Sequence, residues 1–381
     1  MDNEQDLLDY ESRENNFLSP TQSNDVEVVY PHAEIKVERD QYPIFQLFRK
    51  YQKNQIVLDP EFQREDVWNP AQKSELIESV LMGIPLPVFY LNESKDGKLI
   101  VVDGRQRLTT FFAFLNNEFK LQKLRILPQI NGLKFDELES KYQADIEDFQ
   151  LIAQIIKPPT PDRIKFDIFD RVNRGGTPLN NQEMRNALYQ GQSTSLLKEL
   201  ALSSEFEKAT RNSIKSDRMK DRYLILRAIS FDLWYKDRLK DANNQPIVYR
   251  NDIDEFLGKS MDFLNKCSEE TIWVIKGNFL NSMVCNHIVL GEEAFRRLRT
   301  NGRTQPINMI LFEALTILMM NFSQEECLRN KNMIRNKIEN LLGDDKLNKL
   351  LTIDRGRGLV VPEVLKMINE LKGDIRDALE N

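Results

Sequence analysis

Histidine, cysteine and long apolar runs are scarce in this chain of 381 residues, and each shortage excludes a class of protein. The two histidines, His32 and His287, are too few for an HNH-type nuclease, an HD-type phosphohydrolase or a Cys–His protease, which need histidine at fixed places. The three cysteines, Cys267, Cys285 and Cys327, form neither a disulfide framework nor a zinc ribbon, and they suit the reducing cytoplasm.

The sequence also lacks a segment that could cross a membrane. The most apolar stretch, 307–322, contains Asn308, Glu313 and Thr316 and is too short to span a bilayer, so it predicts a buried helix. The N-terminus is acidic and has no apolar region typical of a signal peptide. We therefore expect a cytoplasmic protein that does not contact a membrane.

Basic residues are not in excess. Lys and Arg number 53 against 59 Asp and Glu, a net charge of −6. The first 25 residues hold seven acids and one base, so they carry this whole charge and the remainder of the chain is neutral overall. A neutral body argues against indiscriminate binding of nucleic acid, but it is compatible with local basic faces.

The length and the pattern of apolar residues predict an α+β protein with two domains. Apolar residues make up 41% of the chain, including 21 Phe, which is enough for a sizeable core. We expect an acidic tail without regular structure over 1–28, a mixed α/β domain over 29–195 and an all-helical domain over 196–381.

Short apolar runs alternate with helix signals in the predicted α/β domain. The runs predict strands at 56–58, 87–91, 99–102 and 149–156. Helices are expected after Asn69, after Gly104, over 161–172 and after Asn180. Asn69 is followed by Pro70 and Gln72 and Asn180 by Glu183, so both predict a capping box.

Strand signals nearly vanish after residue 195. Helical periodicity predicts helices at 196–208, 221–234, 253–267, 307–320, 326–342 and 364–379. Their apolar faces are large enough for a core or for a homodimer interface, and periodicity alone does not separate the two.

The sharpest motif is LIVVDGRQRLTTFFAF, residues 99–114. A buried strand is expected to end at Val102, the chain turns at Asp103-Gly104, and an amphipathic helix begins. The free N–H groups of the helix start, the flexible glycine and the side chains of the following residues then converge, which favours a phosphate. Asp103 would hold magnesium or orient an attacking water. The alternative is that Asp103 only caps the helix, with Gln106 completing a capping box.

Two further motifs lie on predicted loops. In VLDPEFQREDVWNPAQ, residues 57–72, Arg64 and several acids stand beside Trp68, which indicates either a ligand loop or a surface loop with ion pairs. In DIFDRVNRGGTPLNNQEMRNA, residues 167–187, Gly175-Gly176 is an ordinary helix end, but Arg171, Asn173 and Arg174 offer more donors than a plain loop needs.

Basic clusters occur at 211–222 and 296–303 in the predicted helical domain. Either could contact a phosphate backbone, and either could be a solvated helix face. The candidates for contact with nucleic acid are Lys215, Arg218, Lys220, Arg296, Arg297 and Arg299.

The order FQR…W, VVDGRQRLTT and FxRVNRGGTPLNNQEMRNA resembles the N-terminal domain of GmrSD-type restriction endonucleases, which carries a DGQQR signature. The segments 219–230 and 291–315 are also similar to this group, so the resemblance covers roughly residues 35–320. It implies a ParB/sulfiredoxin-like α/β core followed by helices, and nucleotide binding and hydrolysis in defence against phage DNA.

The resemblance implies that the DGRQR element binds and hydrolyses a nucleoside triphosphate. The residues that match the family's motifs are Asp103, Gly104, Arg105, Gln106 and Arg107, together with Gln63, Arg64, Asn173, Arg174 and Gly176. Arg105 stands where the family usually has Gln, a change that keeps a donor and adds a charge favourable to phosphate.

We expect a nucleotide-binding and NTP-hydrolysing component of a DNA restriction or anti-phage system. Asp103 would hold magnesium or water, Gln106 would orient the nucleophile, and Arg107 would neutralise charge on the γ-phosphate. Two-domain relatives add an HNH nuclease, whereas this sequence lacks suitable histidines. DNA cleavage is therefore expected from a separate nuclease subunit that this protein regulates or targets.

Two other functions are compatible with the same residues. The protein could be a ParB-like module that binds DNA without catalytic turnover. Direct metal-dependent nicking of DNA by Asp103, Glu61 and Asp167 is the least favoured, since no spacing in the sequence fixes these acids around one metal.

Overall fold

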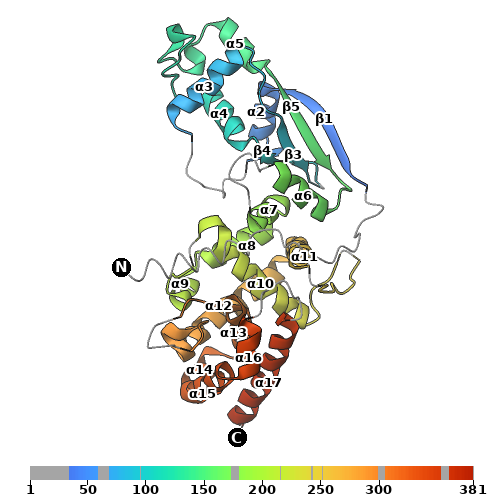
Figure 1. Cartoon of the computed structure of the whole chain (residues 1–381), viewed down its shortest axis with the longest axis vertical. Coiled ribbons are helices and arrows are strands. Elements are labelled where there is room, and N and C mark those ends of the chain that lie inside the picture. The colour runs from blue at the N-terminus through green and yellow to red at the C-terminus, as the bar shows by residue number, and fades with distance from the viewer. Residues whose placement is uncertain are drawn as a thin grey trace. The chain divides into compact units, whose positions relative to one another are not determined.

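The computed structural model describes residues 34–58, 68–94, 96–172, 180–214, 216–241, 243–250, 252–298, 305–352 and 360–380. These residues fall into two compact units that divide at residue 180 (Figure 1). The first unit combines a sheet with helices and the second is helical, which confirms the α+β class predicted from the sequence.

A five-stranded sheet organises the first unit. Its order is β1-β5-β3-β4-β2, with β1–β5 and β3–β4 antiparallel and β3–β5 and β2–β4 parallel. The strands are β1 (Lys36–Pro43), β2 (Ile56–Val57), β3 (Phe89–Glu93), β4 (Leu99–Asp103) and β5 (Gln150–Lys157). The four strands predicted from apolar runs are confirmed as β2 to β5, and β1 was missed.

One face of the sheet packs against helices and forms the core of this unit. Figure 1 shows these helices on one side of the sheet: α2 (Ile44–Gln52), α3 (Pro70–Leu81), α4 (Arg105–Leu115) and α5 (Ser140–Glu147). Alternate residues of the central strands point into the core, as Leu91, Val101 and Ile155 show, and these three are paired across β3, β4 and β5. Ile100 and Ile156, on the other face, are also buried. Burial on both faces explains why β4 is continuously apolar.

The predicted helix starts of the first unit are confirmed. Asn69 caps α3 with Pro70 as the first helical residue and Gln72 completing the capping box. Helix α4 follows Gly104, and α6 spans Asp162–Val172. Two short 3₁₀ helices lie between α4 and α5, at Pro128–Ile130 and Phe135–Glu137.

The second unit is built from helices around one large apolar core. They are α7 (Asn181–Leu188), α8 (Gln192–Ala201), α9 (Ser204–Thr210), α10 (Lys220–Tyr235), α11 (Ile253–Lys266), α12 (Glu269–Leu290), α13 (Met309–Met319), α14 (Gln324–Arg329), α15 (Lys331–Leu342), α16 (Asp345–Thr352) and α17 (Val360–Glu380). All of α13 is buried, which confirms the buried helix predicted for the most apolar stretch. Across the described residues, no helix combines the length and apolarity needed to cross a membrane.

Helix α7 is polar in sequence yet nearly all of it is buried. Asn180 and Glu183 form the predicted capping box at its start. The fully buried Arg185 pairs with Asp254 of α11 at 2.5 Å, and Glu183 pairs with Arg218 at 3.1 Å. These partners belong to the second unit, so ionic contacts fix α7 there.

In the first unit, the buried carboxylate of Glu78 in α3 holds the loop that follows α4. It accepts hydrogen bonds from the backbone N–H groups of Ile126 and Leu127 at 2.8 and 2.9 Å, and a longer one from Arg125 at 3.4 Å. Burial acts to raise the pKa of Glu78, but these donors outweigh it and hold the pKa below its usual value of 4.5.

We expect Glu78→Gln to lower the free energy of unfolding of the first unit by about 1–3 kcal/mol, because a neutral amide is a weaker acceptor than the buried carboxylate for three backbone N–H donors. A folded-state pKa below the unfolded one contributes stability that is complete above the unfolded value of 4.5 and is lost as the pH falls through the folded value. The gap between wild type and variant in urea unfolding should therefore close in acid. Glu75→Gln, at an exposed position of the same helix, is the control. An equal effect of both variants, or a gap independent of pH, would contradict this role.

Candidate functional site

The chain passes from β4 into α4 through Gly104, which the surrounding atoms require to be glycine. Its φ of +94° lies in the left-handed region. A Cβ at this position would lie 2.3 Å from Cδ1 and 2.7 Å from Cε1 of the buried Phe89. The backbone at the start of α4 is thereby brought directly against β3.

Among the residues that the structure describes, no side chain is seen to cap the N-terminus of α4. Gly104 is the N-cap residue and its carbonyl accepts from Leu108 at 2.9 Å, so the interpretation of Asp103 as the cap with Gln106 as its capping-box partner is wrong. The physical reason is that the turn at Gly104 carries Asp103 away from the first-turn amides, and its carboxylate pairs with Arg107 instead. A helix start that begins at a glycine presents its N–H groups and the positive end of the helix dipole to an acceptor.

The Arg107 guanidinium is held on three sides. Its Nη2 lies 3.0 Å from Oδ2 of Asp103, its Nη1 donates to the carbonyl of Pro87, and its Cζ lies 4.2 Å from the centre of the Phe89 ring. Burial lowers the pKa of Arg107 and the adjacent Asp103 carboxylate opposes that effect. The Arg107 side chain is 12% exposed and that of Asp103 is 39% exposed, so the acid is the member of the pair that solvent or a ligand can reach.

Arg105 and Gln106 occupy the first turn of α4, and both are partly exposed. The carbonyl of Gln106 accepts from the Thr110 hydroxyl at 2.8 Å, which leaves its side-chain amide outside that contact. The first turn therefore presents two polar side chains, one of them cationic, beside the backbone N–H groups of the helix start. This arrangement suits an anion such as a phosphate.

Several predicted nucleotide-binding residues lie outside the described residues. These are Gln63, Arg64, Asn173, Arg174 and Gly176, together with Glu61. Asp167 and Arg171 are exposed on α6. Among the described residues, no group of three or more His, Cys, Asp or Glu side chains could hold a metal ion, so the proposed nicking site gains no support there.

The residues predicted to contact nucleic acid differ in their burial and in their hydrogen-bond partners. Arg296 is buried and donates to Gln305 and Glu292 carbonyls and to the Ser213 hydroxyl, so its guanidinium is used within the fold. Arg297 donates to a backbone carbonyl of α16, and burial lowers the pKa of Arg297.

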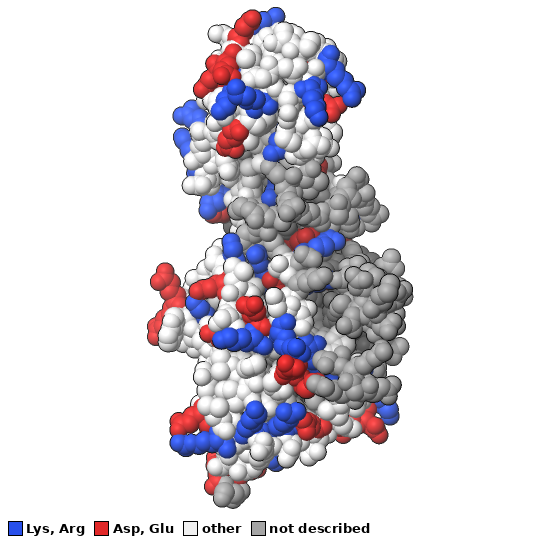
Figure 2. Space-filling model, turned by 90° about the vertical axis from the view of Figure 1, so that its left-hand side faces the viewer, with Lys and Arg blue, Asp and Glu red and all other residues white. Residues whose placement is uncertain are grey.

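The other predicted contacts do not form a continuous basic surface among the described residues. Arg218 pairs with Glu183 at 3.1 Å and Lys220 is half-buried, whereas Lys215 and Arg299 lie outside the described residues. Figure 2 shows acidic side chains interspersed with the basic ones on its visible face. These contacts stay predictions, and Arg296 has the clearest structural role of the six.

Phe89 and Pro87 were not among the residues singled out from the sequence, although they shape this site. They come from β3 and the segment before it, and antiparallel pairing of Tyr90 with Asp103 brings them to the start of α4. Their local sequence carries no motif, so the signal that places them is the pairing of the strands.

Residues 44–190 match the family described as "GmrSD restriction endonuclease, N-terminal domain". The matched range begins at the first residue of α2, contains the whole site at Gly104 and ends after α7. A search of the curated proteins finds no match.

Proposed function

Since residues 44–190 form a GmrSD restriction endonuclease N-terminal domain, a family with a role in restriction systems, we propose that this chain binds and hydrolyses a nucleoside triphosphate at the start of α4. In this proposal the protein acts in the cytoplasm as part of a DNA restriction or anti-phage system, and it regulates or targets a separate nuclease subunit. The observation that carries the proposal is the start of α4, where the N-cap residue is a glycine that lies against Phe89 and offers no capping side chain of its own.

The backbone at the start of α4, its dipole and Arg105 together support phosphate binding. The N–H groups of a helix start and the positive end of its dipole favour an anion. Arg105 adds a positive charge and five donors on the same turn. Gln63, Arg64, Asn173, Arg174 and Gly176 are proposed to complete the nucleotide site from the flanking segments.

Asp103, Gln106 and Arg107 are proposed to act on the γ-phosphate. Water attacks the γ-phosphorus, the bond to the β-phosphate oxygen breaks, and a nucleoside diphosphate and inorganic phosphate leave. Asp103 keeps Arg107 in place through their ion pair, and its exposed carboxylate is available to orient the water. Gln106, in the first turn of α4, helps to orient the same water. The positive charge of Arg107 offsets the negative charge that develops on the γ-phosphate.

Magnesium fits this site as an ion carried by the nucleotide. Mg²⁺ is commonly held by one or two carboxylates together with phosphates and waters, and Asp103 supplies one partly exposed carboxylate. When bound, the ion would neutralise phosphate charge.

Phosphate release from ATP, GTP, CTP and UTP with magnesium, with and without DNA, tests the proposal. We expect turnover of at least one nucleotide, and a fall of at least about 100-fold in Asp103→Asn because the amide cannot replace the charge that orients water and metal. Asp145→Asn, at an exposed position on α5, is the matched control and should keep the wild-type rate.

Three outcomes of this experiment would count against the proposal. One is a folded wild-type protein that neither binds nor hydrolyses any of the four nucleotides. A second is turnover that survives unchanged in Asp103→Asn. The third is DNA binding that ignores nucleotide and falls steeply with salt, which would favour the ParB-like DNA-binding module without turnover.

A further inference from the structure

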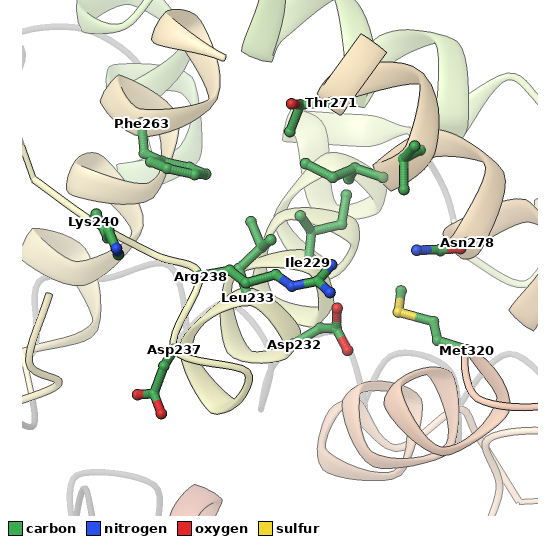
Figure 3. A pocket seen from close by; sticks show the side chains of 12 residues that line it. Ile229, Asp232, Leu233, Asp237, Arg238, Lys240, Phe263, Thr271, Asn278 and Met320 are labelled. Atoms are coloured by element: carbon green, nitrogen blue, oxygen red, sulfur yellow. The ribbon is translucent and has the colours of Figure 1, made fainter. Parts of the chain in front are cut away.

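The helical unit contains a cavity of about 360 Å³ whose lining includes none of the residues of the DGRQR motif. Side chains of α10, α11 and α12, of the segment after α10 and of Met320 line it (Figure 3). All of these elements belong to one compact unit. Its volume falls within the roughly 300–1,000 Å³ of ordinary small-molecule sites.

Most of the cavity wall is apolar. Ile229 and Leu233 come from α10, Val274 and Ile275 from α12, and Phe263 from α11. Such walls favour a flat or compact apolar group. They do not fix the orientation of a ligand, because the hydrophobic effect is not directional. Selectivity must therefore come from the few polar groups that reach the cavity.

Asp232 is a buried carboxylate at this cavity, with 7% of the residue exposed. Figure 3 shows its carboxylate among the lining side chains, turned toward the interior of the cavity. Lys236, one helical turn later, forms an ion pair with its Oδ1 at 2.6 Å. Burial raises the pKa of Asp232, and Lys236 opposes the rise. Arg238 and Lys372 act on the same carboxylate from nearby. A carboxylate has two oxygen atoms with about four acceptor positions, so one ion pair with Lys236 leaves acceptor capacity for a further N–H group.

Arg238 supplies a donor group of opposite charge. Figure 3 shows its guanidinium extending toward Asp232, with Asn278 on the facing side of the cavity. Its positive charge acts to lower the pKa of Asp232. Lys240 also lines the cavity. An acceptor deep in the wall and two cations nearby would together bind a ligand that carries N–H donors at one end and an anion at the other.

We propose that this cavity binds a nucleoside monophosphate, with its base between the apolar walls, the N–H donors of the base on Asp232, and its phosphate on Arg238 and Lys240. The chemistry favours guanine, which presents two neighbouring N–H donors to a carboxylate. Uracil presents one N–H flanked by two carbonyl oxygens, which a carboxylate repels. This site is independent of the one at α4, because its residues lie in a different compact unit.

Isothermal titration of the full chain with GMP, AMP, CMP and UMP, in the absence of magnesium, tests this proposal. GMP should bind more tightly than UMP, and Asp232→Asn should weaken GMP by at least about tenfold, since the amide offers a donor where an acceptor is needed. Asp237→Asn, at an exposed carboxylate of the same lining, should leave the affinity within about twofold.

A second variant tests the phosphate end without touching a buried residue. Arg238 is exposed, so Arg238→Ala should fold normally. We expect the gain in affinity from guanosine to GMP to shrink by at least about fivefold in this variant. The affinity for guanosine itself should stay near the wild-type value.

The Asp103→Asn variant separates this proposal from the one for α4, and it should bind GMP as the wild type does. Loss of GMP binding in Asp103→Asn but not in Asp232→Asn would overturn the proposal and place the binding at α4. Equal affinities for GMP and UMP, or no binding of any monophosphate by the folded protein, would also overturn it.

Discussion

Gly104→Ala is expected to lower the free energy of unfolding of the first unit by about 3 kcal/mol or more, and to abolish the nucleotide binding proposed for the start of α4. The new Cβ would lie 2.3 Å from Cδ1 of Phe89, a distance at which one of the two must move. Phe89 is 1% exposed and packs in the core, so it has little room to yield. A φ of +94° adds the strain of a left-handed backbone.

Gly132→Ala separates the cost of the overlap from the cost of the backbone angle. Gly132 has a similar φ of +84°, but a Cβ there would have nothing within 4 Å. We expect this control to cost about 1 kcal/mol, the price of a positive φ alone. Hydrogen exchange of β3 and α4, measured in both variants, reports on the first unit separately from the second.

The outcome of this pair of variants is decisive for the geometry of the site. Equal protection of β3 and α4 in Gly104→Ala and Gly132→Ala would mean that Phe89 moves aside without loss, and that the close approach is not required. Intact folding with loss of the proposed nucleotide binding in Gly104→Ala would instead mean that the glycine sets the backbone geometry at the start of α4 and contributes little to the stability of the unit.

Arg227→Met is expected to cost about 3–5 kcal/mol in the free energy of unfolding of the helical unit. The guanidinium of Arg227 in α10 pairs with Glu313 of α13, which is 2% exposed, and also contacts the Tyr223 hydroxyl at 3.2 Å. Burial alone would lower the pKa of Arg227, but the Glu313 carboxylate outweighs burial and raises it. Removing the cation leaves a buried carboxylate without its counter-ion.

A double variant shows whether the loss comes from that orphaned charge. Arg227→Met combined with Glu313→Leu removes both charges and keeps apolar volume, so it should recover most of the stability lost in the single variant. Arg329→Met breaks an exposed pair with Glu325, whose side chains are 75% and 70% exposed, and should change stability by less than about 0.5 kcal/mol.

Urea unfolding followed by circular dichroism measures these three variants against the wild type. A double variant no more stable than Arg227→Met would contradict the account, because it would show that packing of Arg227 on its aromatic neighbours, and not the charge on Glu313, supplies the stability. The guanidinium does lie 5.5 and 5.6 Å from the ring centres of Tyr223 and Phe231.

Local hydrogen bonding and apolar periodicity were enough to predict most of the elements. The caps at Asn69 and Asn180 and the start of α4 after Gly104 depend on residues within one helical turn, and all three are confirmed. The motif order also predicted the GmrSD family, which the match over residues 44–190 confirms.

Strand β1 shows where this local information ends. Its sequence, KVERDQYP, is polar and mostly exposed, because β1 is an edge strand that pairs with β5. An edge strand takes its stability from backbone hydrogen bonds to its neighbour and so needs no apolar alternation. The sequence therefore contained no periodic signal from which to predict it.

The sequence by itself determined where α4 begins and which polar residues stand at its start, because capping and helix geometry act over a few residues. Tertiary structure decided that Asp103 pairs with Arg107 over Phe89, that Arg296 is buried and that Asp232 faces a cavity. The physical reason is desolvation: whether a charge is exposed or buried depends on which distant segments cover it, and that covering is fixed only when the chain packs.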